Sequence, residues 1–440
     1  MKYFFFDILL SFTLAVFFTD PRIVLLYFGF KAIGLFYLKY LFQGSDSKVI
    51  KIYNVVFLIF MCYLGITHFV NINDPLVDYF FHNDQIVFYE DALRIGSLKW
   101  NQIIDGSIFN LRYSEYPLFS LFIGLLYKFG IFINITDFLL FFKMSIVLLA
   151  SLIPAMIASI SNLLNIKYKT SSFIIFSLFS YILIQSVVFT RDLPVAFFYT
   201  LLTYLILVPR TKIRMIKILI VIIIITGLRI EQGLFSILFL LIYLISQHHA
   251  NKYFRYFMIL ITMLAAIYFS AYDFVIDIFF EASDVFYNLT STNATNQNSL
   301  YLKLAALPFP FNFIFAFFYT VIMPFPLFIW VKEDITLLLS ITTPFYWIFI
   351  LSISISSLFV KQKKHTILNL LFIACLLFIM LSSYIEPTVR RNFAIYPILF
   401  LHYLSVKNNF SSKFKKTNFY LCLIFIVSIN LLAYIYIVNK

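Results

Sequence analysis

Long apolar blocks are the feature of this sequence that most constrains its fold. They follow one another at about 17 to 25 residues each, close to the roughly 20 residues with which a helix crosses a bilayer. The 440 residues include only 33 Lys or Arg and 20 Asp or Glu, 12% in all, which is about half the charge of a soluble domain. The sequence therefore excludes a soluble globule and predicts a multi-pass integral membrane protein.

The blocks indicate helices rather than barrel strands. Strands of a membrane barrel alternate apolar with polar residues, and runs such as residues 218–226 do not. Since helices and closed barrels are the structures that satisfy the backbone in lipid, we predict an all-α, polytopic transmembrane fold. No internal repeat is visible, so residues 1–440 are expected to form a single integral-membrane domain. The first block lacks a small-residue cleavage site after it, which predicts a retained helix.

The net charge of +13 predicts orientation rather than nucleic-acid binding. The basic residues gather in short loops between blocks, as the positive-inside rule describes for cytoplasmic loops. These clusters are Lys48 with Lys51, Lys167 with Lys169, Arg210 to Lys217, Lys252 with Arg255, Lys361 to Lys364, and Lys413 to Lys416. Alternation then predicts that residues 71–115, 190–192, 227–233, 277–299 and 384–391 lie outside.

Two apolar blocks do not fit simple alternation. A crossing at residues 116–133 would export the cluster at Arg210, so we expect a juxtamembrane or re-entrant segment on the outer side. Four prolines interrupt residues 307–330, which predicts a broken, re-entrant element there. About twelve crossings remain. Residues 71–135 form the predicted outer catalytic loop with juxtamembrane helices, and residues 274–330 form a second outer loop with the re-entrant segment.

The first outer loop contains a predicted short helix. Asn83 or Asp84 suits its N-cap and Gly96 its C-terminal stop. Asp84, Phe88 and Asp91 fall on one helical face, which can present carboxylates to a cleft. In the alternative interpretation, Asp84 only caps the helix and Asp91 is solvated.

This loop resembles that of the GT-C integral-membrane glycosyltransferases, in particular the protein mannosyltransferase and aminoarabinose transferase group. The family pattern reads Asp-Glu-x-x-Tyr-x-x-x-Ala, then a Gly four residues later, then Pro-Pro-Leu and Phe-Gly. The matching residues are Asp84, Ala92, Gly96, Pro117, Leu118, Phe129 and Gly130. Gln85 stands in place of the Glu, Phe88 stands in place of the Tyr with Tyr89 beside it, and one Pro is present. The likeness covers about fifty residues of the chain.

Three later segments are similar to further parts of the family pattern. Asp192 follows Arg191 before a crossing, Arg229 and Glu231 lie in a Gly-bounded turn, and Arg390 with Arg391 precedes Pro397. The resemblance implies catalytic roles for Asp84 and Asp192. It implies substrate binding by Arg229, Glu231, Arg390, Arg391, Arg112 and Tyr89.

The implied activity is transfer of a sugar from a polyprenyl-phosphate-type lipid to a glycan, lipid or protein acceptor, with inversion. Asp84 would be the general base, and arginines would bind the phosphate. The outer face of a bacterial inner membrane, in cell-envelope glycan biosynthesis, is the expected location, with membrane lipids as further partners. The resemblance does not fix any cofactor. Binding of a divalent cation by Asp84, Asp192 and Glu231 is left as an open alternative. The three cysteines predict neither a disulfide framework nor a zinc site.

Two alternatives remain. A polymerase or ligase of surface polysaccharide would use similar outer arginines. A flippase or transporter of lipid-linked glycans would carry charges near the midplane of several helices and often repeated halves.

Overall fold

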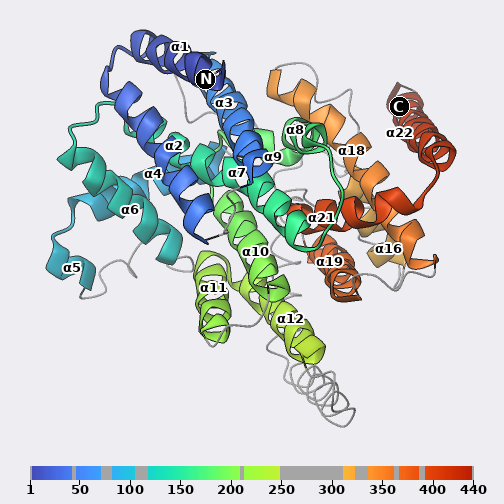
Figure 1. The fold of residues 1–440 in the computed structure, drawn as a ribbon. Helices are drawn as coiled ribbons and strands as arrows, with labels where there is room; N and C mark the ends of the chain where they lie inside the picture. The colour runs from blue at the N-terminus through green and yellow to red at the C-terminus, as the bar shows by residue number, and fades with distance from the viewer. Residues whose placement is uncertain are drawn as a thin grey trace. The chain divides into compact units, whose positions relative to one another are not determined.

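The described part of the chain is helical, as the apolar blocks predict. A computed structural model of the chain describes residues 2–41, 46–70, 82–104, 117–208, 213–247, 311–322, 335–360, 366–385 and 392–438. Within these ranges every regular element is a helix (Figure 1). The chain divides into two compact units, Met1–Ser236 and Ile237–Lys440.

The first unit holds most of the residues that the sequence analysis singled out. Its helices are α1 (Lys2–Phe17), α2 (Arg22–Leu41), α3 (Ser47–Val70), α4 (His82–Ser97), α5 (Trp100–Ile104), α6 (Pro117–Phe132), α7 (Phe138–Leu163), α8 (Thr170–Phe179), α9 (Tyr181–Gln185), α10 (Asp192–Leu207), α11 (Arg214–Leu228) and the start of α12 (Ile230–Gln247). The second unit continues α12 and contains α16 (Phe311–Ile322), α18 (Ile335–Leu358), α19 (Thr366–Ile385), η2 (Phe393–Ile395), α21 (Tyr396–Val406), η3 (Lys407–Asn409) and α22 (Ser412–Val438).

Within the described ranges, four helices are long and apolar enough to cross a membrane. They are Arg22–Tyr40, Ser47–Phe69, Phe138–Leu163 and Ser412–Leu432. A helix needs about 20 apolar residues to span the hydrocarbon, and these segments have 19, 23, 26 and 21 residues. By the length and composition of these helices, the chain is a helical membrane protein.

Helix α7 is the centre of the first unit. It contacts α2, α3 and α10, and nearly all of its residues are buried. Its hydroxyl groups bond to its own backbone: Ser151 Oγ donates to the Leu148 carbonyl at 2.9 Å and Ser159 Oγ to the Ala155 carbonyl at 3.1 Å. These bonds satisfy polar groups in a region that offers no water.

Hydrogen bonds between loop residues and the ends of helices define two opposite ends of this unit. At one, Thr136 Oγ1 donates to Asp20 Oδ2 at 2.9 Å, and His68 Nε2 lies 2.8 Å from Asp137 Oδ2. At the other, Asn162 Nδ2 donates to Asp46 Oδ2 at 2.7 Å. We call these the Asp20 end and the Asp46 end. Helices α2, α3 and α7 each run from one end to the other, in alternating directions along the chain.

Helix α6 starts and finishes at the Asp20 end. Its first turn lies near the first turns of α7, because the Phe189 ring packs on Phe119 of α6 and on Phe142 of α7, with centroids 5.9 and 5.0 Å apart. The end of α11 meets the same turn, since a Cβ on Gly227 would lie 2.2 Å from Leu118. Its last turn leads through Ile135 into the loop that holds Thr136 and Asp137. Helix α4 packs beside α6 (Figure 1). The two run in the same direction, because Phe88 contacts Phe119 and Gly96 lies against Tyr127.

A buried ion pair joins α1 to the candidate span α2, and the sequence analysis did not single it out. Lys31 of α2 donates to Asp7 of α1, and the Tyr27 hydroxyl donates to the same carboxylate at 2.6 Å. Both charged side chains are buried. The carboxylate and the ammonium group neutralise each other, which is how charges are tolerated at membrane depth.

In the second unit, prolines bound a short helix. Helix α16 has 12 residues between Pro310 and Pro324, about 18 Å at 1.5 Å per residue. This is shorter than the roughly 30 Å of a bilayer core. The rest of residues 274–330 lies outside the described residues.

Candidate active site at the Asp20 end

Three of the residues predicted from the sequence meet at the break between α11 and α12. Arg229 Nη1 lies 2.6 Å from Asp192 Oδ1, and Arg229 Nε lies 3.8 Å from Glu231 Oε2. The side chains of Arg229 and Asp192 are only 6% and 2% exposed, whereas that of Glu231 is 33% exposed. Arg229 and Asp192 therefore form a buried, hydrogen-bonded ion pair, and Glu231 beside them is partly exposed.

Local backbone structure creates this meeting point. Asp192 is the first residue of α10, and Arg229 has an extended backbone, with φ −162° and ψ 113°, between α11 and α12. The Tyr199 hydroxyl of α10 donates to the Gln232 carbonyl in the first turn of α12. The turn predicted at residues 227–233 is thus a helix break that faces the start of α10 (Figure 1).

The predicted short helix of the outer loop is α4, with slightly different limits. It begins at His82 and continues through Gly96 to Ser97, so Asp84 lies in its first turn and Gly96 does not stop it. The side chain of Asp84 lies outside the described residues. Gly96 is required for packing, since a Cβ there would lie 1.9 Å from the Tyr127 ring.

A hydrogen bond joins α4 to the corner that precedes Asp192. The Phe189 amide donates to Gln85 Oε1 at 2.9 Å, and both residues are buried. Gln85 is the direct chain neighbour of Asp84, and Phe189 is three residues before Asp192. The first turn of α4 is therefore attached to the start of α10.

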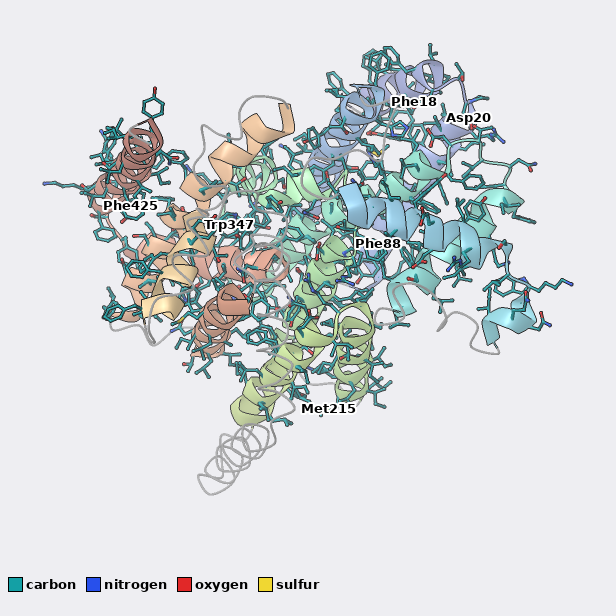
Figure 2. The ribbon with its side chains drawn as sticks, turned by 180° about the vertical axis from the view of Figure 1, so that it is seen from behind. Phe18, Asp20, Phe88, Met215, Trp347 and Phe425 are labelled. Carbon is teal, nitrogen blue, oxygen red and sulfur yellow. The ribbon has the colours of Figure 1, made fainter. Side chains whose placement is uncertain are left out.

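Phe88 makes the second contact between these segments. Its ring centroid lies 5.8 Å from the guanidinium carbon of Arg191 and 4.7 Å from the ring of Phe119. Figure 2 labels Phe88 on this helix. The residue at the family's Tyr position thus contacts the cation beside Asp192.

Asp91 is buried, which contradicts the interpretation that it is solvated. It is 2% exposed and accepts a hydrogen bond from Ser120 Oγ of α6 at 3.3 Å. The face with Phe88 and Asp91 packs on α6, while Glu90 and Arg94 on the other face are exposed.

Tyr89 of α4 packs on α7. Its ring lies edge-on to Phe142 of α7, with centroids 6.3 Å apart. Burial first, and then the neighbouring Tyr127 and Asp137, raise the pKa of the Tyr89 hydroxyl. Tyr89 therefore stays a protonated donor at neutral pH.

The other predicted binding residues lie outside the described residues: Arg112, Arg390 and Arg391. Asn392, which follows them, is buried and accepts a hydrogen bond from Ser382 Oγ of α19. This bond ties the chain after Arg391 to α19.

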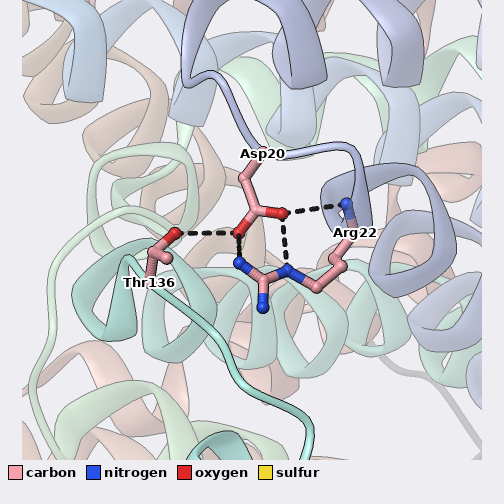
Figure 3. A network of polar contacts seen from close by, with 3 residues as sticks. All are labelled: Asp20, Arg22 and Thr136. Atoms are coloured by element: carbon pink, nitrogen blue, oxygen red, sulfur yellow. Dashed lines mark hydrogen bonds and ion pairs between the residues drawn. The ribbon is translucent and has the colours of Figure 1, made fainter.

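A polar cluster that sequence reasoning missed lies at the same end of the unit. Asp20 accepts two hydrogen bonds from the Arg22 side chain, at 2.7 and 3.0 Å, one from the Arg22 amide and one from Thr136 (Figure 3). Burial alone would raise the pKa of Asp20, but these bonds and the Arg22 charge outweigh it and lower the pKa. Figure 2 labels Asp20 and Phe18 near each other.

Asp137 is the second carboxylate of this cluster. Burial would raise its pKa, but the hydrogen bond and charge of His68 lower it. Asp137 also caps α7 by accepting from the Leu140 amide at 2.9 Å. The sequence carried no local signal for these contacts, because the partners are 69 and 116 residues apart.

The described residues gather no group of three or more His, Cys, Asp or Glu side chains that would hold a metal ion. Asp192 and Glu231 instead face the guanidinium group of Arg229. The divalent-cation site considered in the sequence analysis would also need the carboxylate of Asp84, and that side chain lies outside the described residues.

Comparisons with protein-family models, with curated proteins and with solved structures find no match for this chain.

Proposed function

We propose that this protein is a glycosyltransferase of the GT-C type. It moves a sugar from a polyprenyl-phosphate lipid to an acceptor at the extracytoplasmic face, and the anomeric centre is inverted. The observation that carries the proposal is the bond from the Phe189 amide to Gln85. It attaches the turn that contains Asp84 to the corner that contains Arg191 and Asp192.

The loop contacts support the orientation that this activity needs. Lys48 and Lys167, which the positive-inside rule assigns to the cytoplasm, are close in sequence to the bonded residues Asp46 and Asn162. The opposite, Asp20 end is then extracytoplasmic. In this orientation α6 lies along the outer surface and does not cross the membrane. The proposed topology has about twelve crossings of a bacterial inner membrane.

The proposed chemistry is one displacement. The acceptor hydroxyl attacks the anomeric carbon, its proton passes to the Asp84 carboxylate, and the bond from that carbon to the phosphate oxygen breaks. The polyprenyl phosphate leaves with the bonding electron pair, and guanidinium groups stabilise its charge. Asp192 orients the reacting groups. The proposal drawn from the sequence also assigns phosphate binding to Arg390 and Arg391.

A reconstituted transfer assay tests this proposal. The purified chain in liposomes, given a polyprenyl-phosphate sugar and an acceptor hydroxyl, is expected to transfer the sugar to the acceptor and release polyprenyl phosphate. Asp84→Asn is expected to lower the turnover by about a hundred-fold or more, because an amide cannot accept the proton. Glu90→Gln is the matched control, since Glu90 lies on the exposed face of the same helix. Turnover equal to that of wild type by a folded Asp84→Asn variant would show that Asp84 is not the general base.

A transporter of lipid-linked glycans is the second candidate, and the Asp7–Lys31 pair favours it. A transporter uses charged groups within its spanning helices, and this buried pair places Lys31 inside the candidate span α2. Flux of a fluorescent lipid-linked sugar across proteoliposomes without sugar transfer, lost in Asp7→Asn, would favour transport over the transferase.

A further inference from the structure

Two buried arginines at the Asp192 corner have different partners. Arg229 lies between two carboxylates, with Asp192 at 2.6 Å and Glu231 at 3.8 Å. Arg191 is 8% exposed and has its guanidinium carbon 5.8 Å from the centre of the Phe88 ring. One arginine is thus part of an ion pair within the protein, whereas the other contacts the helix that carries Asp84.

The Arg229 charge is committed to the fold. Moving this guanidinium onto a ligand phosphate would leave the 2%-exposed carboxylate of Asp192 without its cation. An uncompensated buried charge is strongly destabilising. Arg229 is therefore suited to holding the α11–α12 break against the start of α10.

Arg191 lies near the turn that carries the proposed base. In a displacement at the anomeric carbon, the base and the leaving phosphate lie on opposite sides of one sugar ring, a few ångströms from each other. Phe88 follows Asp84 by four residues, about one helical turn. The contact between Phe88 and Arg191 therefore brings a guanidinium close to the turn that carries the proposed base.

We infer that Arg191 contacts the donor phosphate at this corner, and that Arg229 positions Asp192. The inference rests on the proposed function, because it presumes a lipid-phosphate donor. It adds a substrate-binding residue that the sequence motif did not single out, and it gives Arg229 a positioning role. The planar guanidinium of Arg191 suits two oxygens of one phosphate.

Binding of farnesyl phosphate and farnesol to the purified full chain in detergent tests this inference. The two probes share one isoprenoid chain and differ in the phosphate. Wild type is expected to bind farnesyl phosphate more tightly. Arg191→Gln is expected to weaken farnesyl phosphate binding by about ten- to a hundred-fold, the loss of charge-assisted hydrogen bonds, and to leave farnesol binding unchanged.

Two further variants complete the experiment. Arg191→Lys keeps the charge and loses the planar guanidinium group. Its affinity for farnesyl phosphate is therefore expected to lie between the affinities of wild type and Arg191→Gln. This variant decides the test if Arg191→Gln does not fold. Arg94→Gln removes an exposed arginine on the other face of α4; it is the matched control and is expected to keep the preference for phosphate.

The outcomes separate the two proposals. A wild type that binds both probes equally would contradict the lipid-phosphate donor, and with it the proposed function. A wild type that prefers the phosphate, together with folded Arg191 variants that keep the full preference, would overturn only the role of Arg191.

Discussion

Gln85 connects the proposed catalytic turn to the rest of the molecule. Its Oε1 accepts the hydrogen bond of the buried Phe189 amide. The GT-C pattern has a Glu at this position, and a Glu offers the same acceptor oxygen. Gln85 makes this contact with a neutral side chain, so the buried turn carries no charge at this position.

Gln85→Leu is expected to destabilise the protein. The substitution leaves a buried backbone amide without its acceptor, at a cost of about 1–3 kcal/mol. Thermal unfolding in detergent measures the effect, and Glu90→Leu, on the exposed face of α4, is the control. Equal midpoints for Gln85→Leu and wild type would show that the bond contributes nothing to stability.

Asp20 gives the protein an acid-sensitive contact. Its pKa in the folded protein lies below the ordinary value of 3.8, so its bonds to Arg22 and Thr136 add stability above that pH. This stability is lost as the pH falls through the lowered pKa. The unfolding midpoints of wild type and Asp20→Asn should differ at neutral pH and converge below about pH 3.8. A gap that stays constant down to pH 3 would contradict this account.

At the scale of elements, the helices could be predicted and their partners could not. Apolar blocks and polar corners are local signals, and they predicted α3, α4, α7 and the break at Arg229. The contacts of Gln85 with Phe189 and of Thr136 with Asp20 join residues 104 and 116 positions apart. No local pattern encodes such pairs, because packing of whole helices decides them.

The close approach of α4 and α6 depends on Gly96. An alanine there would place its Cβ 1.9 Å from the Tyr127 ring, and overpacking typically costs about 1–3 kcal/mol. Gly96→Ala should therefore lower the unfolding midpoint. Gly29→Ala is the matched control, since nothing lies within 4 Å of a Cβ at Gly29. Equal stability of the two variants would contradict the described packing.

The Asp7–Lys31 pair should behave as a unit. Lys31→Met leaves a buried carboxylate and is expected to destabilise the protein by about 3–5 kcal/mol, whereas the double variant with Asp7→Leu should recover most of the loss. Thermal unfolding of both variants measures this coupling. A double variant less stable than Lys31→Met would show that the two residues are not coupled in this way.

For the whole molecule, charge and loop contacts agree on one orientation. The positive-inside rule assigns the Lys48 and Lys167 clusters to the cytoplasm, and the Asp46–Asn162 bond joins a residue just before Lys48 to one in the last turn of α7, just before Lys167. The fold class could thus be predicted from composition. The sequence predicted that Asp192, Arg229 and Glu231 lie at one membrane face. It could not predict how close they lie to one another, since those distances depend on the helix break at Arg229.

Cysteine labelling measures this orientation. In a background without the three natural cysteines, Trp100→Cys and Lys48→Cys each place a thiol at an exposed position. A membrane-impermeant maleimide should label position 100 in intact cells and position 48 only after the membrane is opened. The reverse pattern would invert the proposed topology.

Cross-linking between positions 84 and 191 tests most directly whether the proposed base and the buried arginines share one extracytoplasmic corner. Asp84→Cys with Arg191→Cys should be joined in intact cells by a short, membrane-impermeant bis-maleimide. Asp84→Cys with Asn162→Cys should not, because the 26 residues of α7 separate the two ends by about 39 Å. Failure of the first pair to react, in a folded protein whose single thiols are both accessible, would contradict the account.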